Sequence, residues 1–211
     1  MHIPDGFLDT KTWVTLDIVS AGFLGISVVK VKNYLDERKF PLMGVMAAFI
    51  FAAQMLNFPV GGGTSGHFMG GVIASILLGP WGGCLVMSSV LIVQCFLFQD
   101  GGLTVLGANI FNMGVIGSTG GYYIYLAISK IIEGRKGILA GAFVASWCSI
   151  VLASVACAME LALSGKVSLI VVLPAMVIVH AFIGAGEAII TVSALSFLLK
   201  IRPDLLEQEV R

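Results

Sequence analysis

The chain has 211 residues with 12 basic and 12 acidic side chains, so 11% of its residues are charged while 58% are hydrophobic. Soluble domains carry about 25% charged residues. This composition therefore excludes a soluble globular domain, a disordered chain and a nucleic-acid-binding protein with a basic surface. The 26 glycines, combined with this hydrophobicity, indicate closely packed transmembrane helices.

The sequence opens with a predicted turn, Pro4-Asp5-Gly6, and not with the basic and hydrophobic segments of a signal peptide. We therefore expect the first residues to remain in the mature protein and residues 1–211 to form a single membrane domain. Seven hydrophobic stretches approach the ~20 residues that a helix needs to cross the hydrocarbon. They are 13–30, 40–57, 68–82, 84–98, 109–132, 137–163 and 168–200. The predicted fold is an all-α polytopic membrane protein with about seven transmembrane helices.

The third and fourth stretches are short and are separated only by Trp81-Gly82-Gly83, which predicts a tight hairpin or a re-entrant pair. Small residues at four-residue spacing let helix backbones approach closely. The second stretch carries such a stripe, and the fifth contains a GxxxG pair. Each is expected to pack against another helix, either in this chain or in a second membrane subunit. The residues are Gly44, Ala48 and Ala52 in the second stretch, and Gly117 and Gly121 in the fifth.

Basic residues orient the predicted spans. Seven spans place ten of the 12 Lys and Arg residues on one side, which the positive-inside rule makes cytoplasmic, and leave only Lys11 and Lys166 on the other. The N-terminus is therefore predicted outside and the C-terminus in the cytoplasm. The ten residues are Lys30, Lys32, Arg38, Lys39, Lys130, Arg135, Lys136, Lys200, Arg202 and Arg211.

The cysteines indicate no metal or disulfide framework. All four lie inside hydrophobic stretches and none forms a CxxC pair. We expect them to pack between helices as small hydrophobic residues. They are Cys84, Cys95, Cys148 and Cys157.

A histidine at the second position gives the N-terminus a chelating geometry. The Met1 amine, the His2 amide nitrogen and the His2 Nδ1 close a five-membered and then a six-membered ring around one metal ion. A second imidazole, such as His67 in the glycine-rich segment 60–67, can fill the fourth position of the plane. Four nitrogens in a plane suit Ni²⁺ or Cu²⁺ and accommodate Co²⁺, whereas zinc prefers a tetrahedron. Spacing alone also allows an idle His2 and a merely flexible loop.

Two ionisable residues lie in the last predicted span. His180 and Glu187 are seven residues apart, hence on one helix face. An ionisable side chain inside a span costs about 2.5–3.5 kcal/mol, which indicates a function by default; the alternative is a hydrogen bond between helices. Asp17 and Glu160 are expected near the outer ends of their spans, where water is accessible. Four amides are expected to join helices: Gln54, Gln94, Asn109 and Asn112.

Glycine-rich segments invite a nucleotide-binding interpretation, but the required motifs are missing. The sequence contains no GxxxxGK[ST], no strand–GxGxxG–helix unit, no GxSxG and no HExxH. The chain therefore cannot hydrolyse ATP at a Walker-type site. If it belongs to an active transporter, the energy comes from another subunit.

Several segments together resemble the CbiM/NikM family, the substrate-binding membrane subunits of energy-coupling factor (ECF) transporters for cobalt and nickel. The similarity covers essentially the whole chain, and the pair formed by the terminal MHIPDG and the later GGTSGH is highly specific. The segments are MHIPDGF (1–7), PLMG (41–44), AAFIFAAQM (47–55), GGTSGH (62–67), LGPW (78–81), DGGL (100–103), GAN (107–109) and HAFIGAGE (180–187).

The resemblance implies a multi-pass protein of a prokaryotic cell membrane that captures Ni²⁺ or Co²⁺ as its transported substrate, without an organic cofactor. It implies metal ligands at Met1, His2 and His67. The implied partners are a small membrane N component, a transmembrane coupling subunit and cytoplasmic ATPase subunits. The stripe Gly44, Ala48 and Ala52 resembles the helix that docks on the coupling subunit.

Three questions stay open on the sequence. His180, Glu187 and Asn109 either support the metal site or belong to a translocation path. The same His180 and Glu187 allow a rival function, an intramembrane metalloenzyme or redox protein, and a purely structural membrane subunit is a third reading. A planar four-nitrogen site argues mildly for nickel over cobalt.

Overall fold

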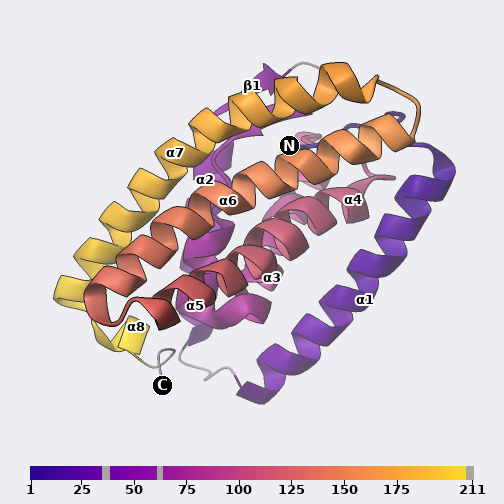
Figure 1. Cartoon of the computed structure of the whole chain (residues 1–211). Helices are drawn as coiled ribbons and strands as arrows, with labels where there is room; N and C mark the ends of the chain where they lie inside the picture. Colours follow the sequence, from indigo (N-terminus) through magenta and orange to yellow (C-terminus); the bar gives the residue numbers. More distant parts are fainter. Residues whose placement is uncertain (35–38, 61–63, 208–211) are drawn as a thin grey trace.

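The computed structural model describes residues 1–34, 39–60 and 64–207. They form a helix bundle with a two-stranded hairpin at one end (Figure 1). In chain order the elements are α1 (Thr10–Tyr34), α2 (Phe40–Gln54), β1 (Asn57–Val60), β2 (Thr64–His67), α3 (Gly71–Phe98), α4 (Leu106–Ile110), the π-helix η2 (Phe111–Gly120), α5 (Gly121–Ile131), α6 (Gly134–Leu163), α7 (Leu169–Ile201) and α8 (Asp204–Glu207).

The all-α polytopic class is confirmed, and the helices lie close to the predicted stretches. Within the described residues, α1, α6 and α7 are long and hydrophobic enough to cross a membrane, and α2 is a shorter hydrophobic helix. α3 reaches that length only across a kink at Gly79. The fifth predicted span corresponds to α4, η2 and α5, which follow one another from residue 106 to residue 131 without a break.

The third and fourth predicted spans are the two arms of α3. Gly79 breaks the helix with φ 77° and ψ 165°, a conformation open to glycine, and Pro80 follows it. A Cβ atom on Gly83 would lie 2.7 Å from the Ser75 Cα, although residues eight apart in a continuous helix are separated by ~12 Å. The chain therefore folds back on itself. The turn lies at Gly79-Pro80 and not at the predicted Trp81–Gly83.

The first arm of α3, residues 71–78, is only ~12 Å long at 1.5 Å per residue. It is therefore too short to cross the ~30 Å hydrocarbon core on its own. It follows directly on β2, so the hairpin and this short arm form one insertion between α2 and the second arm of α3.

The segment 60–67, expected as a glycine-rich loop, instead contains β2. This strand pairs antiparallel with β1, and His67 lies opposite Asn57. Main-chain pairing gives the end of the segment a fixed register that glycine content did not indicate. Residues 61–63 of the predicted loop lie outside the described residues.

α1 lies at one edge of the bundle (Figure 1) and packs against α4. The Ser20 hydroxyl donates to the Gly107 carbonyl at 2.7 Å, and the Gly107 N–H donates to Asp17 Oδ1 at 2.8 Å. A Cβ atom on Gly107 would collide with Asp17. The glycine therefore lets the two helices meet closely enough for both hydrogen bonds.

The two small-residue motifs have different environments. A Cβ atom on Gly117 would collide with the Met69 side chain, and one on Gly121 would lie 2.6 Å from Val72, so this pair packs inside the chain as one reading proposed. For the α2 stripe the same reading is wrong. Gly44, Ala48 and Ala52 are all exposed, because the opposite face of α2 is the one that packs on α3.

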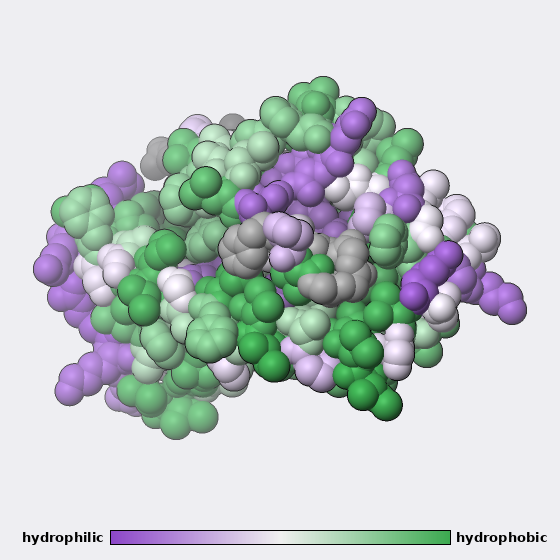
Figure 2. Space-filling model, turned by 90° about the horizontal axis from the view of Figure 1, so that it is seen from above, coloured by the Kyte–Doolittle hydropathy of each residue, from purple (hydrophilic) through white to green (hydrophobic). Residues whose placement is uncertain are grey.

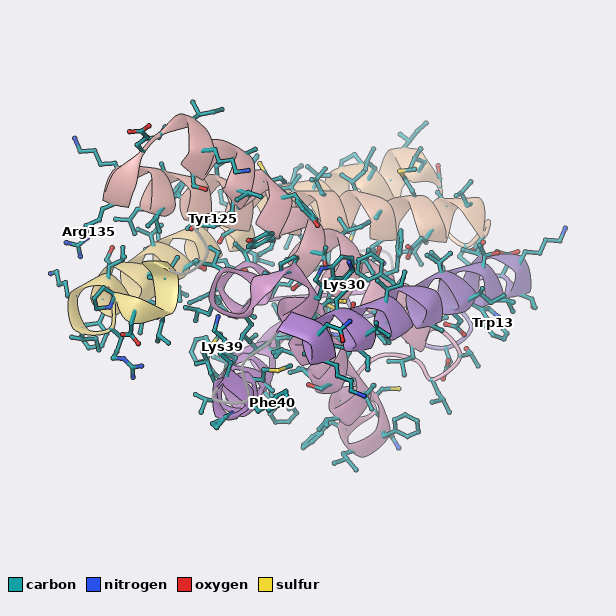
Figure 3. All side chains as sticks on the ribbon, turned by 90° about the horizontal axis from the view of Figure 1, so that it is seen from below. Trp13, Lys30, Lys39, Phe40, Tyr125 and Arg135 are labelled. Carbon is teal, nitrogen blue, oxygen red and sulfur yellow. The ribbon has the colours of Figure 1, made fainter. Side chains whose placement is uncertain are left out.

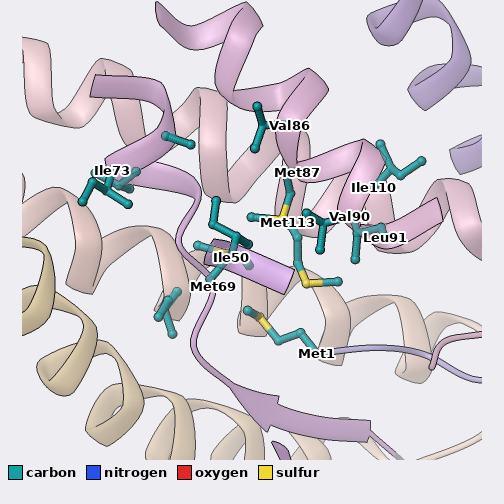
Figure 4. Close-up of a cluster of buried hydrophobic side chains, with 14 of the residues drawn as sticks. Met1, Ile50, Met69, Ile73, Val86, Met87, Val90, Leu91, Ile110 and Met113 are labelled. Carbon is teal, nitrogen blue, oxygen red and sulfur yellow. The ribbon is translucent and has the colours of Figure 1, made fainter. Parts of the chain in front are cut away.

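The core of the bundle includes the first residue of the chain. Met1 is fully buried, and its side chain points among Met69, Met87 and Met113 (Figure 4). The four cysteines are free, and all except the half-buried Cys148 are buried, as expected for small hydrophobic residues between helices.

The basic residues gather at the end of the bundle opposite the hairpin. Figure 3 looks at this lower end and labels Lys30, Lys39 and Arg135 there. Lys30 is ~30 Å along α1 from the start of that helix at 1.5 Å per residue. Arg38 and Arg211, two of the ten residues used to orient the spans, lie outside the described residues.

Candidate metal-binding site

The N-terminal segment enters the bundle at the hairpin end and is held there by main-chain hydrogen bonds. Met1, His2 and Ile3 are all buried. The Ile3 N–H donates to Asn109 Oδ1 at 2.8 Å, while Asn109 Nδ2 donates to the Ile3 carbonyl at 3.1 Å. The Gly102 N–H donates to the same carbonyl at 2.8 Å. Asn109 thus supports the N-terminal segment, one of its two predicted roles.

Asp5 provides a second set of hydrogen bonds that hold the N-terminal segment, at the point where this segment leaves the bundle. Its carboxylate accepts hydrogen bonds from the Leu103 N–H, the Thr104 N–H and the Thr104 hydroxyl, at 2.5–3.0 Å. These bonds, led by the Thr104 hydroxyl, lower the pKa of Asp5. The carboxylate therefore stays charged at neutral pH and keeps all three donors.

The Met1 amine lies against β2. It donates to the Ser65 carbonyl, and it lies 3.3 Å from Ser65 Oγ and 3.4 Å from His67 Nε2. Burial lowers the pKa of the amine from 8.0 to about 5. At neutral pH the amine is therefore uncharged and carries a lone pair.

His2 lies beside His67 and is hydrogen-bonded through one ring nitrogen. Its Nε2–H donates to Gln94 Oε1 at 3.1 Å, which leaves Nδ1 without a proton. The His2 and His67 rings lie 4.7 Å apart between centroids, with a 32° tilt. Burial lowers the pKa of His2 to about 3, so the imidazole is neutral.

His67 lies at the end of β2 and presents Nε2. Its Nδ1–H donates to the Phe68 carbonyl at 2.7 Å, so the lone pair is on Nε2, which faces the Met1 amine. The side chain is buried, and burial lowers the pKa of His67 well below its ordinary value. The structure thus brings together the three residues that the sequence predicts as metal ligands.

A metal ion at this place needs main-chain nitrogen. Within residues 1–34, 39–60 and 64–207, no three His, Cys, Asp or Glu side chains form a group that could hold one. Two neutral imidazoles and a neutral amine meet here instead, with the His2 amide between the amine and its own ring. This donor set suits late first-row metals such as nickel, cobalt and copper.

Glu187 and His180 do not pair with each other. The Glu187 carboxylate accepts the Met69 N–H at 2.6 Å and the Gly70 N–H at 3.0 Å, so it fixes the segment that follows His67. The His180 Nδ1–H donates to the Met176 carbonyl at 2.7 Å. Glu187 therefore binds main-chain N–H groups. It does not form a catalytic or metal-binding pair with His180.

Other polar residues of the spans are hydrogen-bonded as the sequence led us to expect, with one correction. Gln54 Nε2 donates to the Met69 carbonyl at 2.8 Å. The main chain of Met69 is therefore hydrogen-bonded both to Gln54 on α2 and to Glu187 on α7. Glu160 was expected near water, but it is buried. The reason is that it faces η2, where Asn112 Nδ2 donates to Glu160 Oε2 at 2.7 Å.

Sequence reasoning missed three residues of the site. Gln94 was expected only to join helices, yet it fixes the tautomer of His2. Ser65 and Asp100 were noted only as members of the GGTSGH and DGGL segments, without a role of their own. One signal for Asp100 was available, because this carboxylate lies two residues after the end of a hydrophobic stretch and precedes two glycines that permit a tight turn.

A pocket opens beside the site at the hairpin end of the molecule. It has a volume of about 310 Å³, and its lining includes His2, Asn57, Ser65 and Asp100. Seen from above, hydrophilic residues lie near the centre of this end and again at the left and right edges, with hydrophobic residues between them (Figure 2). Of the three predicted ligand residues, His2 lines this pocket.

A polytopic helix bundle with a polar site reached from one end defines a multi-pass membrane protein of the transport or binding class. The family described as "Cobalt uptake substrate-specific transmembrane region" (CbiM) matches residues 2–205. The chain belongs to this family.

Similar proteins agree with this assignment. A putative fused nickel transport protein, NikMN, of Archaeoglobus fulgidus is 43% identical over 99% of this chain and 69% of its own length. The cobalt transport protein CbiM of Sorangium cellulosum is 30% identical over 99% of this chain and 95% of its own. A crystal structure of a truncated transition metal transporter superposes with a TM-score of 0.89, at 31% identity, over 95% of this chain and 99% of that one. These names indicate transport and not catalysis, so the rival enzyme reading has no support.

Proposed function

We propose that this chain captures Ni²⁺ or Co²⁺ as the substrate-specific subunit of an ATP-driven ECF-type importer. The metal is held by the Met1 amine, the His2 amide nitrogen, the His2 Nδ1 and the His67 Nε2. The observation that carries the proposal is the buried Met1 amine 3.4 Å from His67 Nε2, beside a His2 ring whose Nδ1 is unprotonated.

The spacing supports a shared metal ion. Two ligands at right angles around a metal, each at ~2.0 Å, lie ~2.8 Å apart. The amine and His67 Nε2 are only slightly farther apart than this, at 3.4 Å. Both histidines also have their other ring nitrogen bonded, as ligating histidines usually do. A small movement of the hairpin is therefore enough to close the site around an ion.

The planar set of four nitrogens favours nickel. A square-planar arrangement suits Ni²⁺ and Cu²⁺ best and accommodates Co²⁺, and Cu²⁺ binds such a set at least as tightly as nickel. Among the relatives, the name of one states nickel and that of another cobalt. The transported ion in this proposal is nickel or cobalt, and metal availability contributes to its selection.

Energy and release come from partners in this proposal, because the sequence carries no Walker-type motif. The partners are a small membrane N component, a transmembrane coupling subunit and cytoplasmic ATPases. The exposed stripe Gly44, Ala48 and Ala52 is the proposed contact with the coupling subunit. The hairpin end faces outside, since the basic residues at the opposite end then lie in the cytoplasm.

The test uses protein with its native N-terminus and a second version with three residues added before Met1. Bound nickel and cobalt are measured by elemental analysis after purification in detergent. The native version is expected to hold about one ion per chain, and the extended version almost none, because the extension removes the free amine. Equal loading of the two versions would refute the chelate.

Two substitutions in the native version locate the fourth ligand. His67→Ala is expected to remove the metal, whereas His180→Ala is expected to keep it, since the His180 ring donates to a carbonyl of its own helix. Metal that persists in His67→Ala would contradict the assignment of His67.

A further inference from the structure

Asp100 lines the pocket next to the His2 ring. Its Oδ1 is 3.4 Å from His2 Nδ1, the nitrogen that the proposed function assigns to the metal. The Asp100 side chain is 20% exposed, against 3% for His2. The carboxylate therefore lies beside a proposed ligand and also faces the pocket, through which we expect the ion to arrive.

Asp100 is held in this position from two sides. Its N–H donates to the Gln94 carbonyl at 3.1 Å, which fixes it at the end of α3. Asn57 Nδ2, on β1, donates to Asp100 Oδ2 at 3.1 Å. One carboxylate oxygen is thus used by the hairpin, and the other is directed at His2, whose Nδ1 makes no hydrogen bond.

The charges of the proposed complex explain why a carboxylate is useful here. The ion brings two positive charges, the deprotonated His2 amide removes one, and the amine and imidazoles are neutral. One positive charge therefore remains in a buried site, where an uncompensated charge is costly. Among the described residues that line the pocket, Asp100 carries the only charged side chain. Its single negative charge balances the complex.

We propose that Asp100 draws the divalent cation from the pocket to the nitrogen donors and then balances the charge of the bound complex. This inference rests on the proposed function. A carboxylate at the mouth of a buried site raises the local concentration of a cation, and such steering is worth about 10- to 1000-fold in association rate and weakens with salt.

The experiment compares Ni²⁺ binding to wild-type protein and to Asp100→Asn by stopped-flow mixing at several ionic strengths. Asparagine can still accept the Asn57 hydrogen bond, so the hairpin contact is kept while the charge is lost. The association rate constant is expected to fall about tenfold, with a flatter dependence on ionic strength. The Kd is expected to rise by at least the same factor, and Asp100→Glu is expected to restore most of the rate.

Asp9→Asn is the matched control. Asp9 Oδ1 accepts from the Thr12 N–H at 3.2 Å and from the Ser164 hydroxyl at 3.1 Å, at the start of α1 and away from the pocket lining. Asparagine caps a helix as well as aspartate. This variant therefore removes one negative charge from the same protein and is expected to bind Ni²⁺ at the wild-type rate.

Each result decides one question. An Asp100→Asn variant with the wild-type association rate and salt dependence would overturn the inference. A variant that loses affinity at an unchanged association rate would overturn the capture of the cation by Asp100, because the charge would then act only on the bound complex. A wild-type protein that binds no Ni²⁺ would instead contradict the proposed function itself.

Discussion

At the scale of single residues, the site depends on which ring nitrogen of each histidine keeps its lone pair. His2 donates from Nε2 to Gln94, and His67 donates from Nδ1 to the Phe68 carbonyl. Each bond fixes one tautomer and leaves the lone pair on the other ring nitrogen. For His67 this nitrogen is Nε2, 3.4 Å from the Met1 amine. The acceptor for His67 is main chain, so only the His2 tautomer depends on a side chain.

Replacing Gln94 tests this dependence. Gln94→Leu keeps the volume but removes the acceptor, so the His2 ring can rotate or place its proton on Nδ1. Loss of a partner that orients a ligating histidine costs about 10- to 100-fold in metal affinity. Titration of Ni²⁺ by calorimetry measures this change. Gln99→Asn, at an exposed residue of the pocket lining, is the control, and equal Kd values for the two variants would contradict the role of Gln94.

The buried amine predicts an unusual dependence of binding on pH. Burial lowers the pKa of Met1 to about 5 and that of His2 to about 3, so neither ligand holds a proton at neutral pH. Metal binding then displaces only the amide proton. Between about pH 6 and 8, affinity is therefore expected to rise about tenfold per unit, equal to about one proton released. Below about pH 5 the amine competes as well, and the slope becomes steeper.

The short peptide Met-His-Ile provides the comparison. Its exposed amine keeps a pKa near 8 and its imidazole one near 6.5, so binding at pH 7 is expected to release about two protons. Calorimetry in buffers of different ionisation enthalpy counts the protons for both molecules. The same count for peptide and protein would show that burial does not depress the amine.

At the scale of elements, α7 controls the position of the hairpin through one carboxylate. Glu187 accepts the N–H groups of Met69 and Gly70, directly after the strand that ends in His67. Glu187→Ala leaves both buried donors without a partner, at about 1–3 kcal/mol for each. Hydrogen exchange in residues 64–72 is expected to accelerate, and Ni²⁺ affinity to fall at least about tenfold. Glu133→Ala, an exposed acidic residue at the start of α6, is expected to change neither.

The elements show what the sequence could predict. Long hydrophobic stretches gave the helices within a few residues, because bilayer thickness sets their length. The sequence did not predict the turn at Gly79-Pro80 or the strand at 64–67, because both depend on contacts that hydropathy does not record. The turn brings Ser75 against Gly83, and the strand places His67 opposite Asn57.

The candidate site shows the same division. The chelate of Met1 and His2 is visible in the sequence because its rings are closed by neighbouring covalent bonds. Gln94 and Asp100 lie more than 90 residues away along the chain, and only the folded bundle brings them to His2. Glu187 was selected for its cost in a membrane, but its actual partners are main-chain N–H groups that no side-chain pattern reveals.

At the scale of the whole molecule, α2 connects the exposed small-residue stripe with the metal site. At its end, Gln54 donates to the carbonyl of Met69, the residue whose N–H is bound by Glu187. A partner that docks on Gly44, Ala48 and Ala52 and tilts α2 therefore pulls on the segment that carries His67. In the proposed function, this contact couples docking of the partner to release of the ion.

Enlarging the stripe separates capture from transport. In Gly44→Leu with Ala48→Leu, the new side chains have room in the isolated chain, since nothing lies within 4 Å of a Cβ atom on Gly44 and Ala48 is exposed. Ni²⁺ binding by the purified subunit is therefore expected to stay at wild-type level. Close helix packing needs small residues, so uptake of radioactive Ni²⁺ by the complete transporter is expected to fall at least about tenfold.

Gly186→Leu, at an exposed glycine of α7 with equal room, is the control. Normal uptake by the double variant would exclude the stripe as the docking surface, whereas loss of binding would show that α2 controls the site without a partner.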